Sequence, residues 1–329
     1  MPRNLVVCID GTANHYGTVN TNVVHLYKRI CRDDHQLALY EPGVGTFSSY
    51  FGRRAGSAIG RTLGKLFGHG LTENIENGYR FLMRHYTAGD RVFLFGYSRG
   101  AYAVRALAGM LAKCGLLEPG LDNLVPYASR LYTERDNDEV AAGFRATYAR
   151  ECPVHFIGVW DTVKSLGYLY TRRHFFDARL GDHVRHACHA LAIDERRPKF
   201  EPLPWRESER PPGHTLQQVW FSGAHADVGG GYADRALAEI ALQWMQARAE
   251  HHGLLIDPDI EPEQPPDPTG KLHDSLATIP GRILQATHLG ARPRTIEPGA
   301  KIHASVEQRR QHTDYNPDPI PEDYEITPS

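Results

Sequence analysis

Residues 96–100, Gly-Tyr-Ser-Arg-Gly, have the G-x-S-x-G spacing of a reactive serine on a sharp strand-to-helix turn. Glycines two residues on either side let strand and helix approach without Cβ clashes, while the serine takes a strained backbone conformation. Apolar, β-prone residues 91–95 precede the motif, and residues 101–113 carry apolar side chains at helical spacing. Because 31 of the 329 residues are glycine, chance alone supplies this pattern in some chains. The strand and helix around it predict Ser98 as a nucleophile, with Gly96 and Gly100 as its supporting glycines.

A nucleophilic serine needs a base within hydrogen-bond reach and a carboxylate that orients the base. On sheets that carry this motif, the partners follow in the order serine, acid, histidine. Asp161 ends the apolar run 155–160, and His225 ends the segment Trp-Phe-Ser-Gly-Ala-His just before three glycines at 229–231. We therefore expect Asp161 as the acid and His225 as the base, although Asp161 as a turn cap is an open alternative.

Two other aspartates compete with Asp161. Asp194 lies among the charges of Ile-Asp-Glu-Arg-Arg, which is typical of a salt-bridged structural cluster. Asp227 follows His225 by two residues, and we expect it to cap the glycine turn or hold the loop.

An acyl-transfer site also needs two donors for the negative charge on the attacked oxygen. One is expected from the backbone amide after the nucleophile, at Arg99. The loop that begins Asp10-Gly11-Thr12 follows an earlier strand and suits the second role, with the donor at Gly11 or Thr12. Asp10 is then expected to organise this loop by accepting its amides.

The Asp-Gly-Thr triplet also favours a rival class, because haloacid-dehalogenase-type phosphatases carry an aspartate nucleophile two residues before a similar triplet. That earlier position is Cys8 here, so the phosphoaspartyl chemistry and much of a magnesium site are missing. A metal-assisted hydrolase would use Asp10, Asp161, His225 and Asp227, but their spacing matches no metal motif. We expect no metal and no cofactor.

The motifs require a scaffold that brings strand ends together. Short apolar runs alternate with helical patterns, which predicts an α/β fold of the α/β-hydrolase type: a doubly wound, mainly parallel sheet with helices on both faces and lid-like insertions. In such sheets the binding and catalytic residues lie at the carboxyl ends of the strands. The expected strands are 5–9, 91–96, 155–160 and 218–222, and the expected helices are 20–31, 71–86, 101–113, 182–192 and 236–251.

Three segments are expected to decorate a single domain over 1–329. Residues 42–72 have no acid and alternate basic and aromatic residues among glycines, which favours either a lid that contacts a membrane surface or an inward-packed insertion. Residues 257–270 are proline-rich and acidic, and residues 314–329 are expected to form an extended surface tail.

Composition excludes several classes. With 41% apolar residues the chain can bury a large core, and a net charge of −2 gives no general attraction to nucleic acid. Five scattered cysteines without a CxxC pair are expected to be reduced core thiols. No signal peptide or long apolar span is expected, so the chain is predicted to be cytoplasmic as synthesised, with signal-less export left open.

Seven segments in order along the chain resemble one family, the α/β-hydrolase-like catalytic domain of bacterial type VI secretion phospholipase effectors of the first lipase class and their relatives. The resemblance implies that the catalytic serine, aspartate and histidine fall on Ser98, Asp161 and His225. It also implies a phospholipid ester substrate, and it leaves open a partner in the secretion machine. The segments are CIDGTAN, YEPGVGT, GLTENIENGYRFL, FGYSRGAYAVRALAGML, FIGVWDTVKSLG, HALAIDERRPKF and VWFSGAHADVGGGY.

The sequence therefore predicts a serine hydrolase that cleaves carboxylic esters by acyl transfer, with a phospholipid or other lipid ester as substrate. Two alternatives stay open. The chain is either a hydrolase of small soluble esters without a lipid role, or a catalytically idle binding or delivery module that keeps the fold.

Overall fold

The computed structural model describes residues 2–11, 14–43, 59–134, 136–163, 180–206, 210–276, 291–318 and 320–328. Residues 59–69 and 199 are described by their backbone alone.

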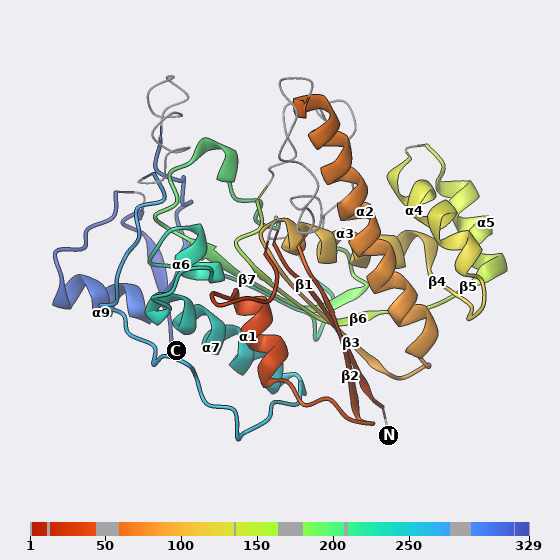
Figure 1. Ribbon diagram of the computed structural model, residues 1–329, viewed down its shortest axis with the longest axis horizontal. Coiled ribbons are helices and arrows are strands. Elements are labelled where there is room, and N and C mark those ends of the chain that lie inside the picture. Colours follow the sequence, from red (N-terminus) through yellow and green to blue (C-terminus); the bar gives the residue numbers. More distant parts are fainter. Residues whose placement is uncertain are drawn as a thin grey trace.

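A parallel sheet of eight strands forms the centre of the described structure, in the order β10-β9-β8-β7-β6-β3-β1-β2 (Figure 1). The order reverses between β1 and β3, because β2 lies on one side of β1 and all later strands lie beyond β3. Ligands of doubly wound sheets bind at such a reversal, outside the carboxyl ends of the strands. The strands are β1 (Asn4–Ile9), β2 (Gln36–Glu41), β3 (Arg91–Tyr97), β6 (Val154–Trp160), β7 (Val184–Ala192), β8 (Thr215–Phe221), β9 (Ala300–His303) and β10 (Tyr324–Thr327).

Helices cover both faces of this sheet, as Figure 1 shows. Alternate residues of β1 face opposite layers: Val7 packs towards α2 and α3, whereas Val6 packs towards α1 and α7. Both layers are buried, so the strands are continuous apolar runs. The expected α/β-hydrolase-like fold is confirmed. The helices are α1 (Asn22–Arg29), α2 (Ile59–His85), α3 (Arg99–Cys114), α4 (Val125–Thr133), α5 (Asp138–Tyr148), α6 (His225–Gly229), α7 (Ala236–His251) and α9 (Ala304–His312), with short 3-10 turns η2 (Asp122–Leu124) and η4 (Pro198–Phe200).

The helix expected at 182–192 is wrong, because Val184–Ala192 forms strand β7 between β6 and β8. Its alanines and histidines favoured a helix. A short apolar run that is buried on both sides has no helical or alternating period to separate the two structures. Its pairing with β6 and β8 decides for a strand, since a gap there would leave both neighbours without backbone partners.

Other segments extend the expected pattern. The tail contributes β10, which pairs with β9 at the sheet edge. A two-stranded antiparallel sheet, β4 (Leu116–Leu117) with β5 (Ala149–Arg150), lies beside α4 and α5. Of the predicted flap at 42–72, residues 44–58 lie outside the described residues, and residues 59–72 belong to helix α2 (Ile59–His85).

Candidate active site

Ser98 lies on the turn between β3 and α3, at φ 57° and ψ −118°. This left-handed conformation costs a non-glycine residue roughly 1–3 kcal/mol. Two close approaches enforce it: a Cβ on Gly96 would lie 2.5 Å from the Gly100 carbonyl oxygen, and a Cβ on Gly100 would lie 2.1 Å from the Ile9 carbonyl oxygen. The Ser98 amide donates to the Trp160 carbonyl at 2.9 Å, so the end of β6 holds the turn.

A chain of hydrogen bonds joins the three residues that the sequence predicted as nucleophile, base and acid. His225 Nε2 lies 2.9 Å from Ser98 Oγ, and His225 Nδ1 lies 2.5 Å from Asp161 Oδ2. All three side chains are buried, with Asp161 fully so. They come from three places in the sheet: the end of β3, the end of β6 and the start of α6 after β8. This geometry permits proton transfer from a serine to a histidine whose tautomer a carboxylate fixes.

Aromatic rings hold the His225 imidazole from two sides. The Tyr97 ring centroid lies 4.7 Å from the imidazole centroid, and the Phe200 ring meets the imidazole edge-to-face at 4.8 Å. The Tyr97 hydroxyl donates to the His225 carbonyl, and the His225 amide donates to Glu195 Oε2. The imidazole therefore has little freedom to rotate away from Ser98.

Charge explains how a fully buried carboxylate remains ionised. Burial raises the pKa of Asp161, but the Arg294 guanidinium and the His225 imidazole outweigh it and hold this pKa well below its usual value. Burial lowers the pKa of His225, although Asp161 acts in the opposite direction. A histidine with a lowered pKa stays neutral, as a general base requires.

Arg294 was missed by sequence reasoning. It lies 133 residues from Asp161 along the chain, where no local pattern marks it. Its Nη1 donates to Asp161 Oδ1 at 2.6 Å and its Nη2 donates to Oδ2 at 2.9 Å. The same guanidinium donates to the carbonyl oxygens of Ala192 and Phe200, each at 2.7 Å.

The two rival acids lie away from the His225 imidazole. Asp194 Oδ2 accepts from the Gly223 amide at 2.6 Å and from the Tyr315 hydroxyl at 2.7 Å. Asp194 therefore holds the turn before α6, rather than joining the arginine cluster that we expected for it. Asp227 accepts from the Ala224 amide at the start of α6. Asp227 therefore caps the start of α6, whereas the sequence placed its cap at the glycine turn that follows.

The Asp10 loop lies beside the serine. A Cβ on Gly11 would come within 3.3 Å of Ser98 Cβ, so this backbone approaches the nucleophile closely. Asp10 accepts from the Gly11 amide at 2.7 Å, from Thr21 at 2.9 Å and from the Tyr40 hydroxyl at 2.9 Å. The Gly11 amide donates to Asp10, and the other predicted donor, Thr12, lies outside the described residues.

The predicted metal alternative is not assembled in the described part of the chain. Burial raises the pKa of Asp10 to about 6, and its oxygens are taken up by the loop. Asp227 Oδ1 instead lies 2.6 Å from His273 Nδ1. No cluster of three or more His, Cys, Asp or Glu side chains suited to a metal occurs among the described residues.

Contacts from the C-terminal third support the acidic residues around His225. Glu195 is buried and accepts from the Ser275 hydroxyl at 3.1 Å as well as from Arg197. Three more carboxylates near His225 have partners from the same part of the chain: Arg294 bonds Asp161, Tyr315 bonds Asp194 and His273 bonds Asp227. With the bond from Ser275 to Glu195, all four carboxylates therefore have a partner beyond residue 248.

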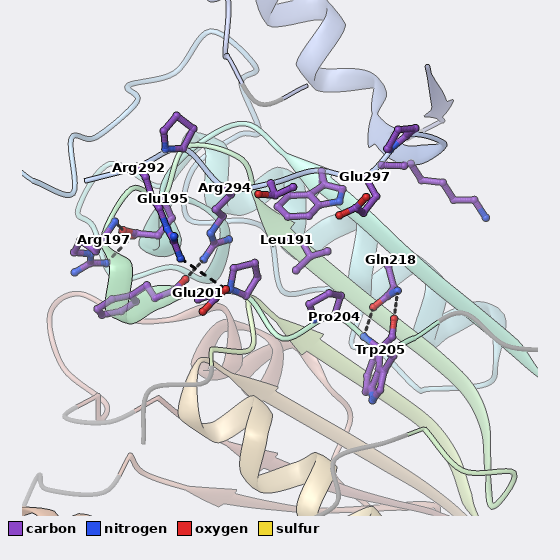
Figure 2. A pocket seen from close by; sticks show the side chains of 18 of the residues that line it. Leu191, Glu195, Arg197, Glu201, Pro204, Trp205, Gln218, Arg292, Arg294 and Glu297 are labelled. Carbon is purple, nitrogen blue, oxygen red and sulfur yellow. Dashed lines mark hydrogen bonds and ion pairs between the residues drawn. The ribbon is translucent and has the colours of Figure 1, made fainter. Parts of the chain in front are cut away.

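A cavity of about 650 Å³ lies next to this cluster (Figure 2). Its wall is formed by β7, β8, the start of β9, η4 and residues 291–299. Arg294 and Phe200 belong both to this wall and to the surroundings of Asp161 and His225. Gln218 fixes one side, because its amide both donates to and accepts from the Trp205 backbone.

A model of the family described as type VI secretion phospholipase effector Tle1-like, catalytic domain, matches residues 3–248. The chain belongs to this family. The match contains Ser98, Asp161 and His225 and ends before Arg294.

Several solved and curated proteins are similar to this chain. The Tle1 effector bound to the VgrG spike of the type VI secretion system has the same fold, at TM-score 0.50 and 14% identity over 90% of this chain and 81% of that one. An uncharacterized Pseudomonas aeruginosa protein is similar at TM-score 0.47 and 18% identity, over 78% of this chain and 46% of that one. An uncharacterized Saccharomyces cerevisiae protein is 34% identical over 61% of this chain, which spans only 32% of that protein.

Within the described residues, none of the helices combines the length and the apolar character that a membrane crossing requires.

Proposed function

We propose that this chain hydrolyses carboxylic esters by acyl transfer through Ser98, His225 and Asp161. One observation carries the proposal: a continuous hydrogen-bonded chain runs from Asp161 through His225 to a serine held at φ 57°. The match to a phospholipase effector family supports the same chemistry.

In the first half-reaction, Ser98 Oγ attacks the ester carbonyl carbon while its proton passes to His225 Nε2, 2.9 Å away. Asp161 Oδ2 accepts a hydrogen bond from the Nδ1–H group of His225 and stabilises the imidazolium that forms. His225 then returns the proton to the leaving alcohol, and the acyl group remains on Ser98. In the second half-reaction, water gives a proton to His225 and attacks the acyl carbon. His225 then returns this proton to Ser98 Oγ as the bond to the acyl group breaks, which releases the acid and restores the Ser98 hydroxyl.

The negative charge on the tetrahedral intermediate needs donors near Ser98. The Arg99 amide is the first of helix α3, and a helix N-terminus favours negative charge. A second donor from the Asp10 loop is supported by the close approach of Gly11 to Ser98, with Thr12 as the candidate.

We further propose a glycerophospholipid or lysophospholipid as the substrate, since the family is that of phospholipase effectors. A secretion-spike partner is proposed on the likeness to the Tle1 effector, which is solved bound to VgrG. Co-purification with a spike protein tests the partner separately from the chemistry.

A fluorophosphonate probe tests the nucleophile. We expect wild type to be labelled and Ser98→Ala to be unlabelled. Ser129→Ala is the matched control, because Ser129 is also buried but lies in α4, away from His225. Labelling of Ser98→Ala at the wild-type rate would reject Ser98 as the nucleophile.

Substrate class is tested on phospholipid vesicles beside a short soluble ester. Release of fatty acid from vesicles at a higher kcat/KM than from the soluble ester supports the lipid substrate. Equal or better cleavage of the soluble ester would contradict it and favour the soluble-ester alternative. A labelled wild type that cleaves neither would leave the ester-hydrolase proposal without support.

A further inference from the structure

Asp161 has a second partner besides the histidine, the Arg294 guanidinium. Arg294 bonds both carboxylate oxygens of Asp161, while the Ala192 amide adds a third donor at 3.0 Å to Oδ1. Because Arg294 donates to both oxygens and Ala192 donates to Oδ1, these donors fix the orientation of the carboxylate, in which Oδ2 faces His225.

The guanidinium is itself fixed in place. Arg294 is only 6% exposed, and the two carbonyl oxygens that accept from it belong to Ala192 at the end of β7 and Phe200 at the end of η4. The planar fork of an arginine can serve a carboxylate and two carbonyls at once, which the single ammonium of a lysine cannot reproduce.

The carbonyl contact at Phe200 links the acid to the base. The Phe200 ring packs edge-to-face on the His225 imidazole, and its carbonyl binds the arginine that holds Asp161. Arg294 thus positions both the carboxylate and the residue that confines the imidazole, without contacting His225 or Ser98 in any hydrogen bond of the described structure.

We propose that Arg294 is a positioning residue for the reaction: it holds both carboxylate oxygens of Asp161, keeps Asp161 turned towards His225, and so links residues beyond the family-matched region to the acyl-transfer site. The inference rests on the proposed function of Ser98, His225 and Asp161.

Two effects follow for the pH dependence of catalysis. Without Arg294, the ionised form of buried Asp161 loses its main stabilising charge, and the His225 imidazolium loses a repelling one. Other titratable groups close to this pair are Glu195, which accepts from the His225 amide, Tyr97, whose ring packs on the imidazole, and His189, whose pKa is lowered by burial and raised by Asp161. Both changes raise the pKa of the group concerned, so the pH at which activity is lost on the acid side must rise.

The test compares Arg294→Ala with Arg292→Ala. Arg292 lines the same cavity, but its side chain is 71% exposed and lies 3.9 Å from Glu201, so its loss should leave activity unchanged. Active sites are counted with the fluorophosphonate probe, and kcat, KM and the pH profile are measured per labelled site. For Arg294→Ala we expect kcat to fall roughly 10–100-fold with little change in KM. This is the size of effect seen when residues that orient the ligands of metal sites are removed. The acid limb of kcat/KM should move up by about 1–3 pH units.

The cavity beside Arg294 allows a chemical rescue. Guanidinium ion, at concentrations too low to unfold wild type, should enter this space and restore part of the activity of Arg294→Ala, while Arg292→Ala should not respond. If Arg294→Ala does not fold, Arg294→Lys carries the test: it keeps the charge but loses the fork, so we expect a lower kcat with a smaller shift of the acid limb.

An acid limb and a per-site kcat equal to wild type would overturn the inference, because a purely structural arginine changes only the number of active sites. Absence of labelling at Ser98 in wild type would instead reject the proposed function, and this inference with it. The two failures are therefore distinguishable.

Discussion

Replacing Asp161 with asparagine should damage stability and catalysis by separate mechanisms. Each carboxylate oxygen accepts from N–H donors: Oδ1 from Arg294 and Ala192, and Oδ2 from His225 and Arg294. An asparagine in either orientation presents its NH₂ group to at least one of these donors. It also leaves the Arg294 charge buried without a counter-charge.

Stability should fall by about 3–5 kcal/mol, the usual cost of removing one partner from a buried ion pair. Urea unfolding followed by tryptophan fluorescence measures this loss. A second substitution, Arg294→Met, removes the unpaired charge. The double variant should therefore be more stable than the sum of the two single losses predicts, by more than about 0.5 kcal/mol.

Catalysis should fall by about 10⁴-fold in kcat per labelled site, because an amide facing His225 Nδ1 favours the wrong imidazole tautomer. The cleavage of an activated ester measures this loss. Additive stability losses would refute the described ion pair, and a kcat within a few-fold of wild type would refute Asp161 as the orienting acid.

Three further predictions concern the scaffold. Gly100→Ala places a Cβ 2.1 Å from a backbone oxygen and should lower stability by about 3 kcal/mol or more in thermal unfolding. Gly143→Ala is the control, because it lies in open space on α5 and should be neutral or slightly stabilising. Equal effects of the two substitutions would contradict the described geometry of the turn at Ser98. Tyr315→Phe removes a donor from half-buried Asp194 and should cost about 1–3 kcal/mol in urea unfolding, so an unchanged midpoint would argue against this contact. Burial lowers the pKa of His189 from 6.5 to about 3. Between these two pH values the unfolded chain binds a proton that the folded chain does not. The contribution of His189 to the free energy of unfolding is therefore fully present above pH 6.5, and it should fall by about 1.4 kcal/mol per pH unit for each such histidine as the pH drops towards 3. Unfolding midpoints that are constant between pH 7 and pH 5 would contradict this predicted loss of stability. Burial lowers the pKa of other histidines in the same way, to about 3 for His25 and to about 4 for His183 and His303.

The candidate site shows which features the sequence could predict. Ser98, Asp161 and His225 each follow a buried strand, and each lies in a local pattern of glycines or turn residues. Because parallel strands end at one edge of a sheet, residues at such positions meet even though they are far apart in the chain. The structure joins them in a chain, with hydrogen bonds from Asp161 to His225 and from His225 to Ser98.

Strand β7 shows where local information ends. Its residues suit a helix as well as a buried strand, and only its neighbours β6 and β8 decide between them. The Gly11 amide gives a second case. The sequence marked it as a possible oxyanion donor, but the folded loop turns it onto Asp10.

The sequence by itself determined the α/β class and the serine turn, because period, glycine spacing and strand-end position act over a few residues. Only the tertiary structure decided which groups support that turn. Arg294 meets Asp161 across 133 residues, and Tyr315 meets Asp194 across 121. A buried charge or hydroxyl finds its partner through the packing of distant segments, and no spacing along the chain records that choice.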